Sequence, residues 1–402
     1  MTVTEAPRFT GDLFTDAAIH EPYDLYREMR DLGPVVWVED LGMYALPRYA
    51  EVRAALGDDQ SFTSARGVAF NDFTNQNQQG TTLASDGDLH RQLRTVLSRG
   101  LNPHALREKR GYVEGLAREL VDHVLERDQF DAVPAFAQAM PLTVVPDLLG
   151  WEEGVRPRLL EWAEAAFDTS GPFNERNEPK LRSVGEMIEY ASTVAAQGRL
   201  APDGLGAAVL AAAERGEIGP EQCPLLMLDF LGPSLDTTAS ALGAAFHLFS
   251  TRPGAWENLR ADPGLIPNAI NEIVRWQSPI RFFTRVATED VEIAGTRIEA
   301  GSRVVMMFAS ANHDERFWER PGDFEVERPN ASRHVGFGYG VHACAGQGLT
   351  RLEAGALLAE LVGRVERFEP AGEPRLATNS IIRAYASVPV RIVRAEQGSH
   401  SR

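Results

Sequence analysis

One glycine-punctuated segment near the C-terminus constrains this chain more than any other. Residues 337–346 read FGYGVHACAG, and a stretch rich in Leu, Ala and Glu with a helical pattern follows. Glycines let the backbone pass close to a flat ligand and adopt a positive φ. The free N–H groups at a helix start favour a thiolate over a thiol. Cys344 therefore meets the requirements for an axial thiolate ligand of haem iron, and the alternative is a structural cysteine in a glycine turn.

Composition and cysteine usage favour an intracellular globular protein. The chain has 402 residues, of which 44% are hydrophobic, so it can bury a large core. The two cysteines exclude a disulfide framework, and Cys223 lies in an apolar helical stretch where a buried, inert thiol is expected. Residues 1–8 have neither a basic nor an apolar signal-peptide region, so we expect no secretory signal and a cytoplasmic location.

The longest apolar stretch does not have the pattern of a membrane span. Residues 225–249 are interrupted by Asp229, Asp236 and His247. Charged side chains are costly in a bilayer, so this stretch predicts a helix buried in the protein. We therefore expect no membrane partner.

The overall charge is strongly acidic, and one segment is basic. The formal net charge of −17 argues against nonspecific nucleic-acid binding. Between residues 90 and 110, one acidic residue, Glu108, stands among six basic ones: Arg91, Arg94, Arg99, Arg107, Lys109 and Arg110. This segment predicts either a binding surface for an acidic partner or a solvated helix face with a few anion contacts.

Hydrophobic periodicity predicts a mainly α fold with a small β lobe on the N-terminal side. Two further helical pieces follow Pro253, and the polar residues 71–80 predict a mobile loop. No Pro- or Ser-rich linker is present, so residues 1–402 are expected to form one domain with disordered or extended ends at about 1–10 and 396–402. The other expected helices cover 22–32, 49–56, 88–99, 104–127, 136–149, 153–168, 176–197, 203–214, 221–251 and 351–368, and strands are expected at 35–38, 42–46, around 286–305 and at 381–393.

A second group of residues points to a buried charge network beside the cysteine loop. Glu272 and Arg275 are three residues apart and share one helical face. Arg328, in the proline-bounded segment 321–329, is a second guanidinium that can join this pair. Because burying such a network costs desolvation energy, we expect it to position the loop that leads to Cys344.

With these features in this order and spacing, the chain resembles a bacterial cytochrome P-450, a haem-thiolate monooxygenase, from about residue 22 to residue 393. The resemblance implies the cytochrome P-450 fold and haem b as cofactor, with Cys344 as the axial ligand of the iron and Phe337 as the aromatic residue beside it. It also implies that four residues bind the haem propionates: His90, Arg94, Arg285 and His334.

The family's oxygen chemistry takes place on a long central helix. Residues 232–238 read GPSLDTT, and the resemblance implies that Asp236 and Thr237 are the acid–alcohol pair that delivers protons to O₂. Pro233 and Ser234 depart from the family's small-residue and glycine pattern. A proline inside a helix cannot donate to the carbonyl four residues earlier, so we expect Pro233 to form the local kink and Ser234 to hold a water or contact substrate.

The implied activity is insertion of one oxygen atom from O₂ into a C–H bond of a small, aromatic substrate, by hydroxylation or O-demethylation. Electrons would come from a ferredoxin and ferredoxin reductase with NAD(P)H, because the sequence has no flavin or iron–sulfur region. The basic segment with Arg333 is the expected ferredoxin site. Two alternatives are a peroxide-driven haem-thiolate peroxygenase, which would not need Asp236 and Thr237, and a non-catalytic haem sensor.

By family position, the substrate pocket is expected to have aromatic walls. Residues 64–68 and 233–238 are similar to members that oxidise para-substituted benzoates and aryl ethers, in which an arginine at the position of Arg66 helps to hold the substrate carboxylate. For each aromatic residue, packing in the core is an equal alternative. The expected pocket residues are Arg66, Phe70, Phe73, Phe167, Phe230, Ser234, Ile280, Phe282, Phe283 and Ile381.

Overall fold

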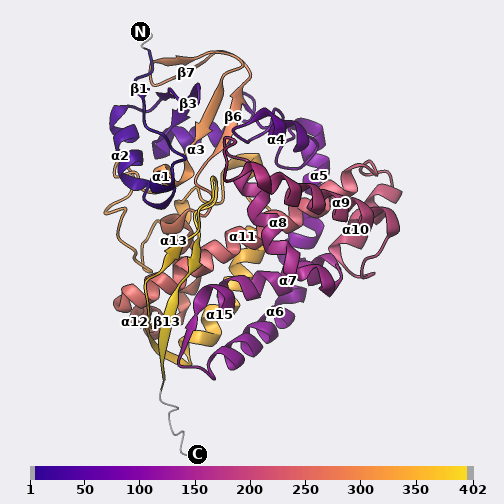
Figure 1. Cartoon of the computed structure of the whole chain (residues 1–402), viewed down its shortest axis with the longest axis vertical. Coiled ribbons are helices and arrows are strands. Elements are labelled where there is room, and N and C mark those ends of the chain that lie inside the picture. The colour runs from indigo at the N-terminus through magenta and orange to yellow at the C-terminus, as the bar shows by residue number, and fades with distance from the viewer. Residues whose placement is uncertain (1–4, 396–402) are drawn as a thin grey trace, which may run out of the picture.

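The computed structural model describes residues 5–395 and has a β-containing lobe above a larger helical body (Figure 1). The main sheet has six strands in the order β1-β2-β3-β9-β6-β4 and joins N-terminal strands to strands from residues 283–306. Its core contains apolar side chains from both regions, such as Phe9, Val36 and Val305. The strands are β1 (Arg8–Phe9), β2 (Val36–Val38), β3 (Met43–Leu46), β4 (Phe62–Thr63), β6 (Phe283–Ala287) and β9 (Arg303–Met306).

Three smaller sheets complete the β structure of the described residues. A three-stranded sheet has the order β10-β13-β5, and two hairpins pair β7 with β8 and β11 with β12. These strands are β5 (Gln129–Asp131), β7 (Val291–Ile293), β8 (Thr296–Ile298), β10 (Val365–Pro370), β11 (Arg375–Leu376), β12 (Tyr385–Ser387) and β13 (Pro389–Arg394).

Helices form most of the body. The expected helices are present with ends that differ by a few residues, whereas three short helices, α1, α4 and α14, were not predicted. Local signals explain several boundaries: Asn102 caps α6 through its side chain, and Gly150 ends α7 in the left-handed conformation. The helices are α1 (Asp16–His20), α2 (Tyr23–Leu32), α3 (Tyr49–Gly57), α4 (Asp72–Asn77), α5 (Gly87–Leu101), α6 (Pro103–Val124), α7 (Ala139–Leu149), α8 (Arg156–Asp168), α9 (Leu181–Gln197), α10 (Leu205–Glu214), α11 (Gln222–Thr251), α12 (Pro253–Ala261), α13 (Ile266–Gln277), α14 (Phe308–Ala311) and α15 (Gln347–Val362).

Helix α11 passes through the middle of the molecule (Figure 1). Its 30 residues span about 45 Å at 1.5 Å per residue. The first half packs in one hydrophobic cluster with α8, α9 and α10, and the second half packs in another with α6, α13 and α15. Because α11 joins both clusters, we propose that the described residues form one domain. None of the described helices is long and apolar enough to cross a membrane.

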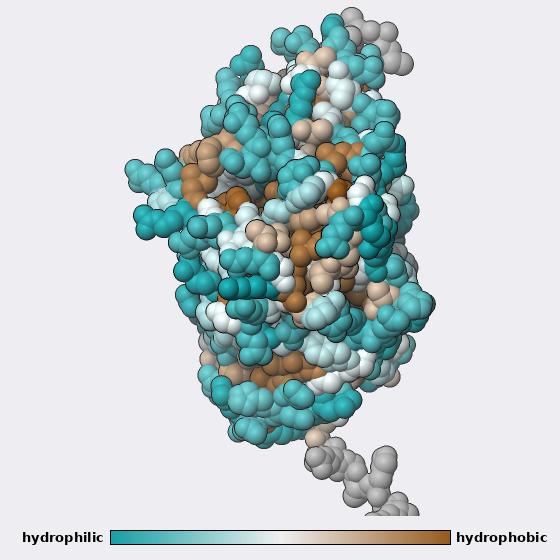
Figure 2. Space-filling view, turned by 90° about the vertical axis from the view of Figure 1, so that its right-hand side faces the viewer, coloured by the Kyte–Doolittle hydropathy of each residue, from teal (hydrophilic) through white to brown (hydrophobic). Residues whose placement is uncertain are grey.

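Hydrophilic residues cover most of the face shown in Figure 2, and apolar residues appear there in small, separated areas.

Two expectations about secondary structure were wrong. The stretch 71–80 is not a mobile loop throughout, because residues 72–77 form α4. Asn71 caps this helix, and Asn75 hydrogen-bonds the backbone of Ala69 through both its amide oxygen and its amide nitrogen. Polar side chains thus anchor α4 in place of an apolar stripe, so hydrophobic periodicity could not detect it.

The helix expected at 351–368 ends early. Helix α15 covers Gln347–Val362, and Val365–Pro370 forms β10, which pairs with β13. The buried residues of β10, Val365 and Phe368, are three apart because the pairing with β13 shifts register between Val365 and Arg367, and this spacing resembles a helical period in the sequence. At the ends of the chain, Arg8–Phe9 forms β1, with Phe9 buried, whereas residues 1–4 and 396–402 lie outside the described residues.

The expected charge network is present and fully buried. Glu272 accepts hydrogen bonds from Arg275 at 2.7 and 2.8 Å and from Arg328 Nε at 2.9 Å. Arg275 also donates to the carbonyl of Asn312, whose side chain accepts from Val335 N at 2.8 Å. Through Asn312, the network therefore reaches Val335, just before the glycine-rich segment 337–346 that contains Cys344, which we call the cysteine loop.

We expect Arg275→Ala to destabilise the protein strongly, because it leaves the buried Glu272 carboxylate with one guanidinium partner. Removing one member of a buried pair costs about 3–5 kcal/mol. The free energy of unfolding from urea titration measures this loss. The matched control is Arg320→Ala, an exposed arginine paired with Asp323 and Glu325, which should change stability by less than about 1 kcal/mol. Equal effects of the two substitutions would contradict a structural role for the network.

Candidate active site

A large cavity lies between α11, the cysteine loop and the β lobe. Its empty space, including the opening to solvent, is about 1320 Å³. Elements that are far apart in the sequence line this cavity: helices α5 and α11, strand β6 and the loop residues 336–346.

The cysteine loop forms one wall of the cavity. Cys344 N donates to the carbonyl of Phe337 at 2.8 Å, and both residues line the cavity. Gly338 and Gly340 have φ values of +67° and +74°, which other residues rarely adopt. A side chain at Gly340 would also lie 2.6 Å from the carbonyl oxygen of Leu56. Glycine at this position therefore allows the loop to pack against α3.

The electrostatics of Cys344 differ from the sequence-based expectation. Burial raises the pKa of its thiol, and the N–H groups of Gly346 and Gln347 and the charge of Arg94 offset only part of this effect. The helix start alone does not make this thiol a thiolate. A coordinated metal ion deprotonates a thiol, so ligation would supply the missing stabilisation.

Three of the four expected propionate-binding residues line the cavity: His90, Arg94 and Arg285. His90 Nε2 is buried without a hydrogen-bond partner among the described residues. Burial, together with the charges of His342 and Arg94, lowers the pKa of His90 to about 4. Burial also lowers the pKa of Arg285 to about 10, and its guanidinium donates to the carbonyl of Thr284. Arg94 donates to the carbonyl of Ala343 at 2.7 Å.

His334 is not among the residues that line the cavity. It is buried behind the loop, where its Nδ1 accepts from Gly336 N at 3.0 Å and its ring contacts Phe337. The histidine that lines the cavity is His342, two residues before the cysteine. The structure therefore does not bring His334 together with the other three expected residues, because position in the sequence does not show which way a loop side chain points.

Sequence reasoning missed His342 and its partner Asp86. Their side chains lie 2.8 Å apart, and the His342 ring packs against His90 at 4.1 Å between ring centroids. Although burial opposes it, hydrogen bonds from His342 and Thr63 lower the pKa of Asp86 to about 2. The position of His342 inside the cysteine loop was the signal that could have identified it.

The acid–alcohol pair lies at the middle of α11. Thr237 lines the cavity and donates to the carbonyl of Pro233 at 2.5 Å. Asp236 is not among the cavity-lining residues and lies on the side of α11 near Glu164 and Lys180. Burial and the charge of Glu164 raise the pKa of Asp236 to about 8, so the neutral acid predominates at pH 7. A neutral carboxylic acid in this position can donate a proton.

Five of the ten expected pocket residues line the cavity: Phe167, Phe230, Ser234, Ile280 and Phe283. The other five do not. Three of these are core residues of the β lobe, where they pack against its sheet: Phe70, Phe282 and Ile381. Phe73 has 52% of its surface exposed and contacts Phe173, and Arg66 is exposed at the surface.

The position of Arg66 corrects its expected role. Its backbone carbonyl accepts from Arg303, and its exposed side chain is outside the cavity. The chain resembles benzoate-oxidising proteins in this segment, yet the arginine that would hold a carboxylate does not reach the pocket.

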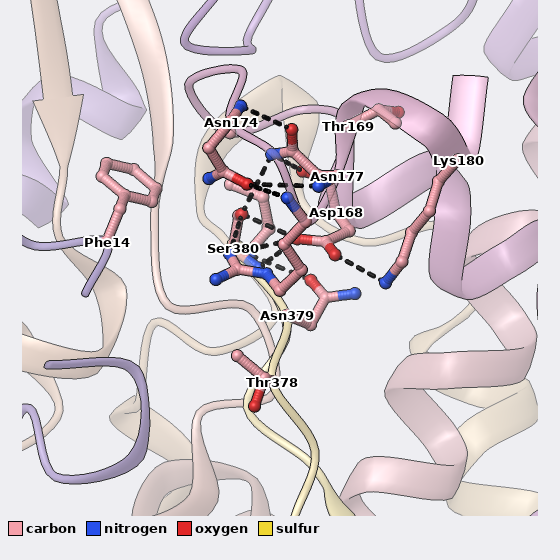
Figure 3. Close-up of polar contacts among 12 residues, drawn as sticks. Phe14, Asp168, Thr169, Asn174, Asn177, Lys180, Thr378, Asn379 and Ser380 are labelled. Carbon is pink, nitrogen blue, oxygen red and sulfur yellow. Dashed lines mark hydrogen bonds and ion pairs between the residues drawn. The ribbon is translucent and has the colours of Figure 1, made fainter. Parts of the chain in front are cut away.

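A buried polar cluster joins the end of α8 to the C-terminal segment near the cavity (Figure 3). Asp168, with no exposed side-chain surface, accepts from Lys180 Nζ at 2.6 Å and from the backbone N–H and hydroxyl of Ser380 at 2.8 and 2.7 Å. Asn177 donates to the Asp168 carbonyl, and Arg176 donates to the Ser380 hydroxyl. Because Phe167 precedes Asp168 and lines the cavity, this Asp168 cluster holds one wall of the cavity in place.

Comparison with known proteins identifies relatives along nearly the whole chain. The family model described as "Cytochrome P450" matches residues 264–382. The protein "Cytochrome p450 CYP199A2" of Rhodopseudomonas palustris is 37% identical over 96% of this chain and 93% of that protein. Linalool 8-monooxygenase of Pseudomonas putida is 27% identical over 95% of this chain and 97% of that protein.

Solved structures agree on the fold. The structure of cytochrome P450 CREJ in complex with (4-ethylphenyl) dihydrogen phosphate superposes with a TM-score of 0.87 at 23% identity, covering 94% of this chain and 99% of that chain. The mainly α fold with small sheets that the sequence predicts is thereby confirmed.

The contribution of Asp168 to the stability of the protein should depend on pH. Although burial opposes it, hydrogen bonds from Lys180 and Ser380 lower the pKa of Asp168 below its ordinary value. Its stabilising contribution is therefore present above about pH 4, the unfolded value, and is lost as the pH falls through the folded pKa. We expect Asp168→Asn to lose about 2 kcal/mol in urea unfolding at pH 7, and less as the pH is lowered below 4.

The control for this prediction is Glu164→Gln, which removes the other carboxylate partner of Lys180. The Glu164 side chain is 52% exposed, so its ion pair should contribute less than about 1 kcal/mol. A loss at pH 7 that is equal for both variants would contradict the role assigned to Asp168.

Proposed function

The chain belongs to the cytochrome P450 family, and on this basis we propose that it inserts one oxygen atom from O₂ into a C–H bond of a small aromatic substrate, with electrons from a ferredoxin. Its relatives are cytochrome P450 monooxygenases, so the chain is an oxidoreductase that acts on organic substrates and binds haem b. Beyond this family membership, we propose that the substrate is aromatic, that the reaction is hydroxylation or O-demethylation, that a ferredoxin supplies the electrons and that the residues named below have the roles given there.

The residues around the cavity fit haem b. A thiol, Cys344, lies on one wall, and the groups that suit haem carboxylates are His90, Arg94, Arg285 and His342. Among residues 5–395, His90 Nε2 has no hydrogen-bond partner, and the buried guanidinium of Arg285 donates to the neighbouring carbonyl of Thr284. When bound, haem b supplies the binding and reductive activation of O₂. We assign Cys344 as its axial ligand and Phe337 as the aromatic residue beside it.

The observation that carries the proposal is that Cys344, Thr237 and a group of aromatic side chains face one cavity. Phe167, Phe230 and Phe283 line it from α8, α11 and β6, together with Ile280 and Pro279. Flat, apolar walls of this kind complement an aromatic ring and exclude water from it. These residues would therefore position the substrate, with Ser234 as a polar contact beside them.

We assign proton delivery to Asp236 and Thr237. Thr237 lines the cavity, and Asp236, neutral at pH 7 because of its raised pKa, is close enough to Glu164 and Lys180 to interact with their charges. Glu164 and Lys180 are partly exposed, so they would connect Asp236 to solvent. Asp236 would receive protons from the Lys180 side, and Thr237 would hold the donated proton or a water at the cavity.

The electron donor is proposed to bind beside the cysteine loop. Arg107 is exposed and Lys109 is half-buried, and neither has an ion-pair partner among the described residues. Arg333 is exposed and stacks on Phe317, and Tyr339 and Val341 of the cysteine loop are large apolar residues at the surface. Cations around an apolar centre suit an acidic protein such as a ferredoxin.

Not all of the basic segment contributes to this surface. Arg94 lines the cavity, while Arg91, Arg99 and Arg110 form ion pairs with Asp88, Glu217 and Glu114. The part of the basic segment that has free charge is therefore Arg107 and Lys109.

Reconstitution with ferredoxin, ferredoxin reductase and NAD(P)H tests the proposed reaction. With 4-methoxytoluene as substrate, we expect formaldehyde release from O-demethylation, or a hydroxylated product. In Asp236→Asn this rate should fall by on the order of 10²-fold, because the variant lacks the proton-donating acid. The rate with H₂O₂ in place of O₂ and electrons should be nearly unchanged, since peroxide brings its own protons.

Asp236→Glu, which keeps an acid, is the matched control for the loss of rate in Asp236→Asn. The same two measurements also separate the alternative functions. Turnover with peroxide but not with NAD(P)H would indicate a peroxygenase and contradict the proposal. Haem binding without turnover under either condition would indicate a sensor.

Charge reversal tests the ferredoxin surface. We expect Arg107→Glu combined with Lys109→Glu to slow ferredoxin-dependent reduction by about tenfold or more at low ionic strength and to weaken its salt dependence. Stopped-flow measurement of the reduction rate against salt concentration gives both quantities. Arg27→Glu in α2, an exposed arginine of the β lobe, is the control. An unchanged rate and salt dependence in the double variant would exclude this surface.

A further inference from the structure

Helix α11 presents a carboxylate to the cavity one turn before Pro233. Asp229 lines the cavity, and its Oδ2 accepts hydrogen bonds from Thr82 N at 2.7 Å and from the Thr82 hydroxyl. The other oxygen, Oδ1, makes no hydrogen bond to any of the described residues. Asp229 is half-buried, and burial raises the pKa of its carboxyl to about 6.

No cation among the described residues forms an ion pair with Asp229. Arg94 attracts it electrostatically, but the guanidinium of Arg94 donates to the carbonyl of Ala343 in the cysteine loop. The cationic and imidazole groups that line the cavity are those that suit the haem carboxylates. Asp229 therefore faces the cavity with a hydrogen-bond acceptor that the protein itself does not satisfy.

The backbone adds a second acceptor at the same residue. The carbonyl of Asp229 would receive a helical hydrogen bond from residue 233, but Pro233 has no N–H. The neighbouring residues of α11 that also line the cavity are uncharged: Phe230, Pro233 and Ser234. This turn of α11 therefore offers acceptors and a hydroxyl to a ligand, and it carries no positive charge of its own.

An aromatic carboxylate would bring a like charge, or an unpaired acceptor, to Asp229. A ligand group that donates a hydrogen bond would instead satisfy Oδ1, and a cationic donor would also compensate the buried charge. The structure places Arg66, the residue expected to hold a carboxylate, at the surface.

We propose that Asp229 determines substrate specificity by selecting small aromatic molecules that carry a hydrogen-bond donor, a protonated amine or a hydroxyl, over aromatic carboxylates. This inference rests on the proposed function, because it assumes an aromatic substrate in the same cavity. It goes further in naming the polar group that the cavity recognises.

A matched series of ligands tests the inference with the haem-loaded protein: 4-methoxybenzylamine, 4-methoxybenzyl alcohol, 4-methoxytoluene and 4-methoxybenzoate. Dissociation constants are measured by calorimetry and by the Soret shift. We expect the amine and the alcohol to bind at least about tenfold more tightly than the benzoate, since a site built around a polar group discriminates strongly against a ligand that leaves it unpaired. Comparison of the amine with the alcohol separates the effect of charge from that of donation.

Asp229→Asn is the informative variant, because its amide oxygen can still accept from Thr82 while the negative charge is lost. We expect the advantage of the amine over the benzoate to fall by about tenfold or more, with tighter benzoate binding. Asp229→Ser provides a second variant of smaller size. Asp203→Asn, an exposed carboxylate in the turn before α10, is the control and should leave all four affinities unchanged.

The results separate failure of this inference from failure of the proposed function. Benzoate binding as tight as that of the amine and the alcohol, or a ligand ranking unchanged in Asp229→Asn, would overturn the role of Asp229 while binding of 4-methoxytoluene still supports an aromatic substrate. If the protein binds none of the four ligands, both proposals fail. The spectrum of the reduced carbon monoxide complex confirms that each variant retains the thiolate-ligated haem.

Discussion

The site depends on one buried carboxylate shared by two guanidinium groups. Glu272 binds Arg275 and Arg328 with no exposed side-chain surface on Glu272 or Arg275, and the spare donors of both arginines bind backbone carbonyls. Burying three charges is costly unless every donor and acceptor is satisfied. The network meets this condition by collecting carbonyls from residues 312–323, and those segments are thereby fixed around the cysteine loop.

The cavity is electrostatically divided. Its positive and imidazole groups come from α5, β6 and the cysteine loop, whereas its carboxylate comes from α11. This division is the basis for our proposals that the cations bind the cofactor and that Asp229 is an acceptor for the substrate. Asp236, seven residues after Asp229 on the same helix, has its pKa raised further, to about 8, by burial and by the charge of Glu164. One helix thus carries two carboxyl groups whose different surroundings suit them to different roles.

Much of the arrangement could be predicted from local sequence. The cysteine loop has glycines at positions that require a positive φ, and the Glu272–Arg275 spacing places both residues on one helical face. The helices of the body were predictable because their apolar residues repeat with a helical period. Helix α4 was not, because polar contacts from Asn71 and Asn75 hold it. His334 and His342 could not be ranked from sequence, since both lie near the cysteine and only the folded loop shows which one faces the cavity.

The sequence by itself determined which residues are candidates for the chemistry: a thiol in a glycine loop, an acid and an alcohol side by side on a central helix, and the members of a charge network. These are local patterns, which can be identified from residue type and spacing alone. Only the tertiary structure decided which side chains share the cavity. It placed Arg66 and Phe73 at the surface, packed Phe282 and Ile381 into the core of the β lobe and turned Asp229 toward the cavity. The physical reason is that burial and charge compensation depend on neighbours distant in the chain, which no local pattern records.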